Sequence, residues 1–178
     1  PADGEAVVLV DARAHGGGEP GLLSLEAGLG KMRAAVAARQ EAGLVVVART
    51  SALNLVSLDE AVRRAAAYAT CGADALFFTG VNEWEQLAAI QAVSGGLPII
   101  LGGTPAKMSD RARLAAHGVR VALQGHQPFA AAVAALHATL KALRDGTPPS
   151  DLPNIAPAAL MKAVTREGDY AAFTRDFL

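Results

Sequence analysis

Short apolar runs alternate with helical patterns along almost the whole chain, and this order limits the folds open to it. Five runs rich in β-branched and aliphatic residues predict strands, at 6–11, 44–49, 75–79, 98–101 and 119–123. Apolar residues at helical spacing predict helices between and after them, at 24–42, 57–71, 83–93, 109–117 and 128–144. A repeated strand–helix–strand order predicts a parallel α/β sheet with right-handed crossovers.

Capping signals mark where several of these helices begin. Ser24 and Ser109 stand just before helical patterns, and Ser57 is followed three residues later by Glu60, as in a capping box. Such a sheet is either an open, doubly wound sheet or part of a (β/α)8 barrel, and periodicity alone does not separate the two. Since no strand is followed by G-x-G-x-x-G or a P-loop, the nucleotide-binding version is disfavoured.

Composition and charge exclude several classes of protein. The 178 residues are 52% hydrophobic and 4% aromatic, which predicts one domain with a core of small aliphatic side chains. The 16 basic and 17 acidic residues nearly cancel, so neither nucleic acid nor an anionic membrane is an expected partner. No apolar stretch approaches the roughly 20 residues that span a bilayer. The single Cys71 excludes an internal disulfide and a CxxC metal site, and predicts a cytoplasmic location.

The clearest functional signal is the end of the second predicted strand. The stretch Leu-Val-Val-Val-Ala-Arg-Thr-Ser-Ala at 44–52 predicts a buried parallel strand that delivers Arg49 to its carboxyl end. Proteins with parallel sheets bind their ligands at that end. A guanidinium offers a planar fork of donors that suits a carboxylate or phosphate, so an acidic small molecule is the expected ligand. The alternative is a structural arginine paired with a neighbouring acid.

Several motifs carry a family resemblance. Ala-Arg-Thr-Ser-Ala at 48–52, the Leu-Asp-Glu-Ala helix from Leu58 and Cys-Gly-Ala-Asp-Ala at 71–75 resemble the isocitrate lyase/phosphoenolpyruvate mutase superfamily. The segments 28–35, 79–81, 118–126 and 168–177 together resemble its oxaloacetate decarboxylase branch. The matches cover nearly the whole chain and occur in family order. The resemblance implies a parallel (β/α)8 barrel of the TIM type, of which this chain supplies about strands four to eight and a C-terminal helical tail.

The resemblance also suggests a domain organisation. Residues 1–145 would be the C-terminal portion of the barrel, the Pro- and Gly-containing segment 146–153 a linker, and 154–178 a helical tail. In the family this tail is commonly exchanged between the subunits of a dimer or tetramer, so a homo-oligomer is expected. A half barrel has two unpaired edges, and we expect either a longer protein or a second chain to complete it. The absent initial Met favours the longer protein.

The resemblance implies an activity and residues to carry it. It implies a Mg²⁺-dependent carbon–carbon lyase for a small 2-oxo acid or dicarboxylate, with oxaloacetate decarboxylation to pyruvate as the best single prediction. Arg49 would bind the substrate carboxylate, and His126 would hydrogen-bond the substrate or shuttle a proton. Thr50 and Gly80 would line the substrate site. Asp11 matches an acid of the family's metal shell, although the direct Mg²⁺ ligands are not expected in this chain.

Two departures from the family pattern leave alternatives open. Val10 stands where the family has a Glu, and a valine cannot hydrogen-bond a metal-bound water. Gly102 and Gly103 replace a polar or aromatic residue, which would widen the pocket or leave it without a donor. The alternative function is therefore a non-catalytic homologue that acts as a structural or regulatory subunit, or more weakly a binding module without turnover. His15, in the family's mobile-loop region, is expected to be merely exposed.

For two of these residues a structural role is the alternative. His126 would then be a loop histidine that caps the helix beginning near Pro128, and Asp11 an ordinary aspartate at the end of a strand.

Overall fold

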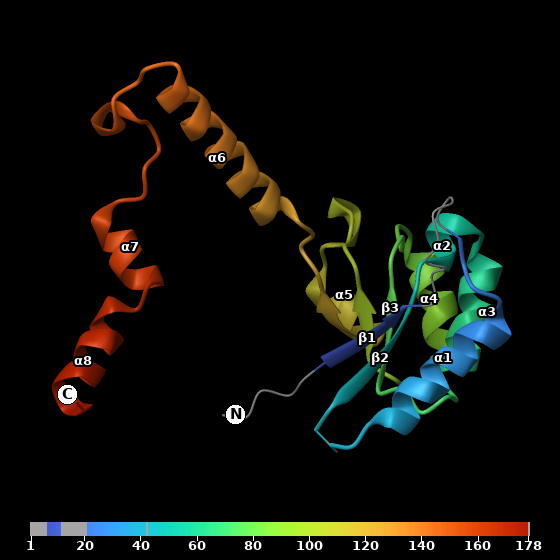
Figure 1. Cartoon of the computed structure of the whole chain (residues 1–178). Coiled ribbons are helices and arrows are strands. Elements are labelled where there is room, and N and C mark those ends of the chain that lie inside the picture. The colour runs from blue at the N-terminus through green and yellow to red at the C-terminus, as the bar shows by residue number, and fades with distance from the viewer. Residues whose placement is uncertain (1–6, 12–20, 42, 178) are drawn as a thin grey trace. The chain divides into compact units, whose positions relative to one another are not determined.

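Five parallel strands form one sheet in the computed structural model, which describes residues 7–11, 21–41 and 43–177, with side chains from residue 21 onward (Figure 1). The strands follow one another across the sheet in chain order, and every neighbouring pair is parallel. They are β1 (Val7–Asp11), β2 (Val45–Thr50), β3 (Ala75–Phe78), β4 (Ile99–Leu101) and β5 (Val119–Ala122). The predicted strands and their parallel arrangement are confirmed. Each crossover moves one place in the same direction, as in the wall of a barrel.

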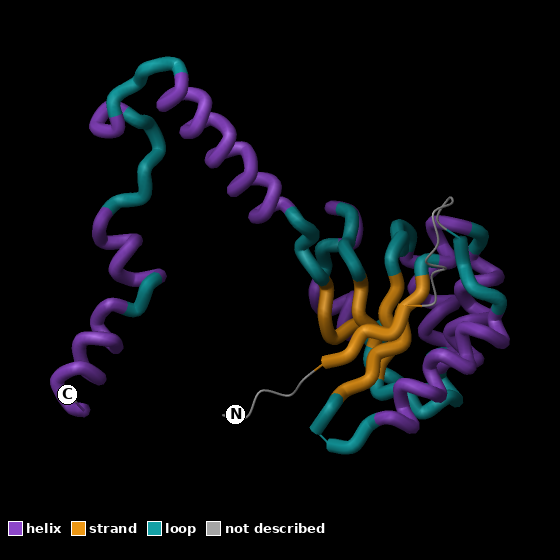
Figure 2. The backbone as a smooth tube through the Cα atoms, viewed as in Figure 1, coloured by secondary structure: helices purple, strands orange, loops and turns teal. Residues whose placement is uncertain are grey.

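The helices of this sheet pack on one of its faces (Figure 2). They are α1 (Leu25–Ala38), α3 (Leu58–Tyr68), α4 (Trp84–Val93) and α5 (Arg111–Ala116). The main core joins strand residues such as Leu76, Phe78 and Ile99 to helix residues such as Leu29 and Leu87.

The opposite face of the sheet has a second, smaller core. Among the described side chains it consists of Val47, Ala75 and Phe77, with Val45 and Ile100 packed against them, and all five come from strands. An open doubly wound sheet carries helices on both faces, whereas a barrel carries them on the outside alone. The chain therefore folds as part of a (β/α)8 barrel, with the helix-free face toward the barrel interior.

Two of the predicted helix starts are confirmed. The Ser24 hydroxyl accepts a hydrogen bond from the Ala27 N–H at 3.1 Å, and the Ser57 hydroxyl accepts one from the Glu60 N–H at 3.2 Å. Each serine therefore satisfies one of the backbone donors that a helix leaves without a partner in its first turn.

The predicted start at Ser109 is wrong by one residue. Asp110 is the N-cap of α5, and its Oδ1 accepts a hydrogen bond from the Arg113 N–H at 3.0 Å. Ser109 instead ends the short 3-10 turn Ala106–Met108 with helical backbone angles. An N-cap needs extended backbone, which Asp110 has, and aspartate caps a helix as well as serine does.

A second compact unit begins at His126, directly after the first unit ends at Gly125. Its helices are α6 (Gln127–Arg144), α7 (Ala158–Val164) and α8 (Glu167–Phe177), with a 3-10 turn at Pro149–Asp151. The predicted helical tail consists of two helices, and Arg166 adopts a left-handed φ of 56° between them. The boundary between the two units lies before α6, whereas the sequence predicted that residues up to 145 belong to the barrel. The assignment of α6 to the barrel stays a prediction. Throughout the described part, every helix is too short or too polar to cross a membrane.

Candidate functional site

Arg49 stands near the carboxyl end of β2, on the helix-free face of the sheet. Successive side chains of a strand point to opposite faces, so Arg49 shares its face with Val45 and Val47 of the inner core. Its guanidinium carbon lies 5.3 Å from the ring centre of Phe77, which is its partner in the β2–β3 register. This distance is within the range of a cation–π contact. The predicted position at a strand end is confirmed, while the role in carboxylate binding stays a prediction.

Three polar side chains join the ends of β2 and β3 beside this arginine. The Asn54 amide donates to the Thr79 hydroxyl at 3.2 Å, and the Thr79 hydroxyl donates to the Ser51 hydroxyl at 3.0 Å. Asn54 belongs to a one-turn helix, α2 (Ala52–Leu55), which the sequence analysis missed. The available signal was Ser51 directly after the strand, with an amide side chain one turn later. The cluster fixes the loop after β2 against the end of β3.

Gly80 follows this cluster and has no room for a side chain. Its φ is 87°, and a Cβ built on it would lie 2.0 Å from Oδ1 of Asn54. The Asn82 amide also donates to the Gly80 carbonyl at 3.1 Å. Glycine therefore lets Asn54 approach the backbone and reach Thr79. Gly80 lies at the predicted edge of the sheet, and its contact with substrate stays a prediction.

Thr50 is buried and faces the other side of the sheet from Arg49. Its register partner on β3 is Phe78, which belongs to the helix-side core. The Thr50 hydroxyl accepts a hydrogen bond from the Ala52 N–H at 3.2 Å. The structure thus gives Thr50 a contact that shapes the start of α2. Its predicted role as a substrate contact stays a prediction, and the structure does not bring its hydroxyl to Arg49.

Gly102 follows β4 on the inner face and has no open space beside it, whereas a Cβ on Gly103 would meet nothing within 4 Å, so the effect of the two glycines on the pocket stays a prediction. A Cβ built on Gly102 would lie 2.8 Å from Cγ2 of Thr79 and 3.0 Å from Cε2 of Phe77. The space that a side chain would take is already filled by a methyl group and an aromatic ring. Gly102 therefore makes room for Phe77 and adds no volume to the site.

The metal-shell residues predicted from the family lie at the limit of what the structure describes. The backbone of Asp11 stands opposite Arg49 in the β1–β2 register, but the side chains of Asp11 and Val10 are outside the described part. His15 is outside it altogether. Among the described side chains, no group of three or more His, Cys, Asp or Glu residues could hold a metal ion. These residues alone therefore do not fit a Mg²⁺ site.

His126 occupies the N-cap position of α6, in the second unit. Its carbonyl accepts a hydrogen bond from the Ala130 N–H at 3.0 Å, but its imidazole makes no capping hydrogen bond. The structural alternative, a histidine at the cap of this helix, is therefore confirmed in position, although the imidazole itself does not cap. Because Arg49 belongs to the first unit, the joint action of the two residues stays a prediction.

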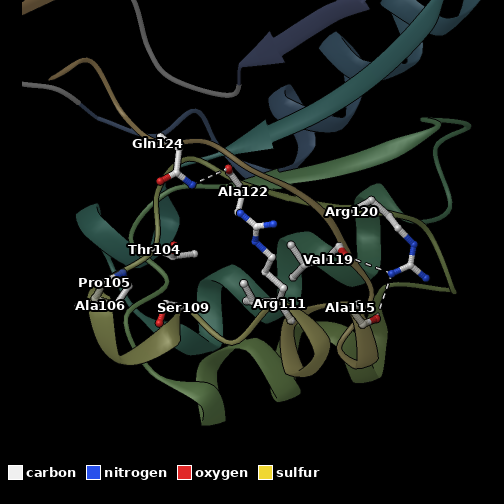
Figure 3. A pocket seen from close by; sticks show the side chains of 11 residues that line it. Thr104, Pro105, Ala106, Ser109, Arg111, Ala115, Val119, Arg120, Ala122 and Gln124 are labelled. Atoms are coloured by element: carbon white, nitrogen blue, oxygen red, sulfur yellow. Dashed lines mark hydrogen bonds between the residues drawn. The ribbon is translucent and has the colours of Figure 1, made fainter. Parts of the chain in front are cut away.

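A surface pocket of about 670 Å³ lies at the β5 edge of the sheet and contains none of the predicted site residues. Figure 3 shows Arg111 reaching across it toward Ala122. Arg120 also lines this pocket and donates to the carbonyls of Ala115 and Val119 at 3.0 and 3.1 Å. This pocket is on the helix-covered side of the sheet, away from the face that carries Arg49.

The sequence profile of the phosphoenolpyruvate phosphomutase family matches residues 3–144. The chain belongs to this family. Within it, the oxaloacetate decarboxylase of Bradyrhizobium sp. (strain ORS 278) is 49% identical over 166 residues, which are 93% of this chain and 57% of that relative. The chain thus spans little more than half the length of such relatives. The resemblance to the oxaloacetate decarboxylase branch is confirmed.

Solved structures agree with the partial barrel. Oxaloacetate acetylhydrolase in complex with the product oxalate superposes with a TM-score of 0.71 at 26% identity, over 93% of this chain and 61% of that one. Phosphonopyruvate hydrolase in complex with oxalate and Mg²⁺ has a TM-score of 0.71 at 24% identity, over 96% of this chain and 62% of that one. This second likeness bears on the fold alone.

Proposed function

We propose that the protein is a carbon–carbon lyase that converts oxaloacetate to pyruvate and CO₂. The observation that carries the proposal is the position of Arg49, at the carboxyl end of a barrel strand and on the inner face. The relative at 49% identity is named an oxaloacetate decarboxylase, which supports this substrate. A cytoplasmic location, predicted from the single cysteine, remains part of the proposal.

The chemistry assigned to this chain is binding of a carboxylate and return of a proton. Arg49 holds a carboxylate of oxaloacetate through charge-assisted hydrogen bonds and so orients the substrate. Cleavage of the C3–C4 bond releases CO₂ and leaves its electron pair in the enolate of pyruvate. A proton delivered to C3 then completes pyruvate, and His126 is the proposed donor because an imidazolium can give up a proton as a general acid.

Dependence on Mg²⁺ is a further part of the proposal. The phosphonopyruvate hydrolase that shares this fold carries Mg²⁺ together with oxalate. The described side chains do not form a ligand set, so the ion would need residues outside them. Binding of the carboxylate and return of the proton require only Arg49 and His126 of this chain.

The test is pyruvate release from oxaloacetate by the complete gene product, with Mg²⁺ and with EDTA. Reactions without enzyme correct for spontaneous decarboxylation. Arg49→Ala should cost about 3 kcal/mol in kcat/KM, because a charge-assisted contact with the substrate is lost. Arg111→Ala, in the pocket of Figure 3, is the matched control and should leave kcat/KM unchanged. Activity that survives Arg49→Ala but not Arg111→Ala would move the site to that pocket.

The second candidate function is a non-catalytic homologue, which the named enzymes among the relatives do not favour. Wild-type protein that binds oxalate but releases no pyruvate under any metal condition would establish this second candidate.

We also propose that the protein is a homo-oligomer, a dimer or tetramer, assembled through its C-terminal helix. In α8, Tyr170, Phe173 and Phe177 are exposed. Several large apolar side chains exposed on one short helix indicate an interaction site. Light scattering should give a multiple of the subunit mass, and Phe173→Glu with Phe177→Glu should shift it to the monomer. A monomeric wild type would contradict this part.

A further inference from the structure

We propose that Phe77 is a positioning residue for Arg49, and that Gly102 is a glycine because the Phe77 ring needs its space. The inference deepens the proposed function, since it concerns the same carboxylate-binding arginine. Phe77 acts through Arg49 and requires no contact of its own with substrate. The affinity of the protein for a carboxylate would therefore depend on an aromatic ring in the barrel wall.

The ring is fixed, and the guanidinium lies over it. Phe77 is only 5% exposed and packs in the inner core with Val47, Ala75 and Ile100. Arg49 is its direct partner across the β2–β3 ladder, with the guanidinium carbon 5.3 Å from the ring centre. The negative face of an aromatic ring attracts a guanidinium at this distance, so the pair restricts where the cation stands.

Gly102, directly after β4, leaves free the space that the Phe77 ring and the Thr79 methyl group fill. Cε2 and Cζ of Phe77 lie 3.0 and 3.3 Å from the position that a Cβ on Gly102 would take. The Thr79 methyl group lies 2.8 Å from the same position, and the Thr79 hydroxyl is bonded to Ser51 and Asn54. A side chain at 102 would have to displace the ring or this cluster. Because residue 102 has no side chain, the Phe77 ring keeps its place beneath Arg49.

Such support matters because an arginine side chain has many rotamers. A carboxylate that binds a mobile guanidinium must first order it, which weakens binding. A guanidinium already held over a ring loses less freedom when the ligand arrives. The expected signature is a change in KM with little change in kcat, because the support acts on binding before the C–C bond breaks.

The decisive pair of variants is Phe77→Leu and Phe78→Leu. Phe78 is the next residue of the same strand, is 2% exposed and packs on the helix side, away from Arg49. Both changes remove the same atoms from a buried position, so both lower stability. Phe77→Leu should raise KM for oxaloacetate about tenfold in the complete gene product, whereas Phe78→Leu should not. Phe77→Tyr, which keeps the ring, should restore the wild-type KM.

A second readout does not depend on turnover. An aromatic ring shifts the NMR signal of a proton held over it, so the Arg49 Hε signal, identified by its loss in Arg49→Lys, reports the contact. Phe77→Leu should move this signal and Phe78→Leu should leave it in place. If the signal moves but wild-type protein releases no pyruvate, the positioning role stands and the proposed function falls. If Phe77→Leu matches Phe78→Leu in both signal and KM, the positioning role is wrong.

The role of Gly102 is tested by a double-mutant cycle. Gly102→Ala alone should raise KM, because the added methyl group displaces the ring. In the Phe77→Leu background the same change should add little, since the ring is already gone. Gly43→Ala is the control, because a Cβ there meets nothing within 4 Å. Fully additive effects would show that Gly102 acts independently of Phe77 and would overturn this part.

Discussion

The carboxylate of Asp74 accepts a hydrogen bond from the backbone N–H of Val46, with Oδ2 lying 2.7 Å from the nitrogen. Arg39 donates to the same oxygen at 2.7 Å and to the Leu44 carbonyl at 3.2 Å. The bond from Val46 is the main reason that the pKa of Asp74 lies below its usual value; burial opposes the shift and Arg39 adds to it. Asp74 therefore ties the end of α1 to the start of β2.

The first prediction is a pH-dependent loss of stability in Asp74→Asn. A carboxyl whose pKa is lowered by folding stabilises the native state above its unfolded pKa of about 4, and loses this effect as the pH falls through the folded pKa. The free energy of unfolding of wild type should exceed that of Asp74→Asn by about 1 kcal/mol at pH 7, a modest figure because Asp74 is 38% exposed. Urea unfolding between pH 7 and pH 3 should show this difference shrinking below pH ~4. A difference independent of pH would contradict the assignment.

The second prediction separates backbone strain from side-chain contact at Gly80. Gly96→Ala places a side chain at a φ of 79° with nothing within 4 Å, so it should cost about 1–2 kcal/mol of strain alone. Gly80→Ala has a similar φ but must also displace Asn54, and its loss in unfolding free energy should be clearly larger. Adding Asn54→Ala to Gly80→Ala should remove the part of the loss in unfolding free energy that exceeds the loss in Gly96→Ala. Equal losses at the two glycines would show that Asn54 yields without cost.

The third prediction compares two arginines that share one acid. Arg64 and Arg63 both bond to Glu60, at 2.7 and 2.8 Å, but their side chains are 3% and 59% exposed. Arg64 also donates to the Tyr68 hydroxyl and to the Leu23 carbonyl, so its loss leaves a buried hydroxyl and a part-buried carbonyl without this donor. Arg64→Ala should lower the unfolding free energy by about 3 kcal/mol, and Arg63→Ala by less than about 0.5 kcal/mol. Similar losses in denaturant titrations would contradict this difference.

Much of the fold could be predicted from the sequence because its signals are local. β-branched runs gave the strands and placed Arg49 at a strand end, and Ser57 with Glu60 marked a helix start. The short helix α2 could not be predicted, because contacts of Ser51 and Asn54 with Thr79 on another strand hold its loop. Periodicity also could not say that helices cover only one face. Which faces the helices cover depends on the direction in which successive crossovers move across the sheet. The barrel was favoured by the family resemblance instead.

Gly102 shows why the candidate site was harder to predict than the fold. Taken alone, a glycine at a strand end suggests added space, and nothing nearby in the sequence says otherwise. The reason for this glycine lies on the neighbouring strand, where Phe77 and Thr79 already occupy the volume. The left-handed Arg166 that divides the tail into two helices is a similar case, since arginine carries no sequence signal for that conformation.

The last prediction concerns His126 as a proton donor. His126→Asn should lower kcat for oxaloacetate at least about a hundredfold and leave KM nearly unchanged, because a general acid acts after the substrate is bound. Asparagine is a good N-cap residue, so α6 should still begin at Gln127, which circular dichroism can check. His137→Asn, at an exposed position within α6, is the control and should behave as wild type. An unchanged kcat in His126→Asn would leave the proton to another donor and remove His126 from the mechanism.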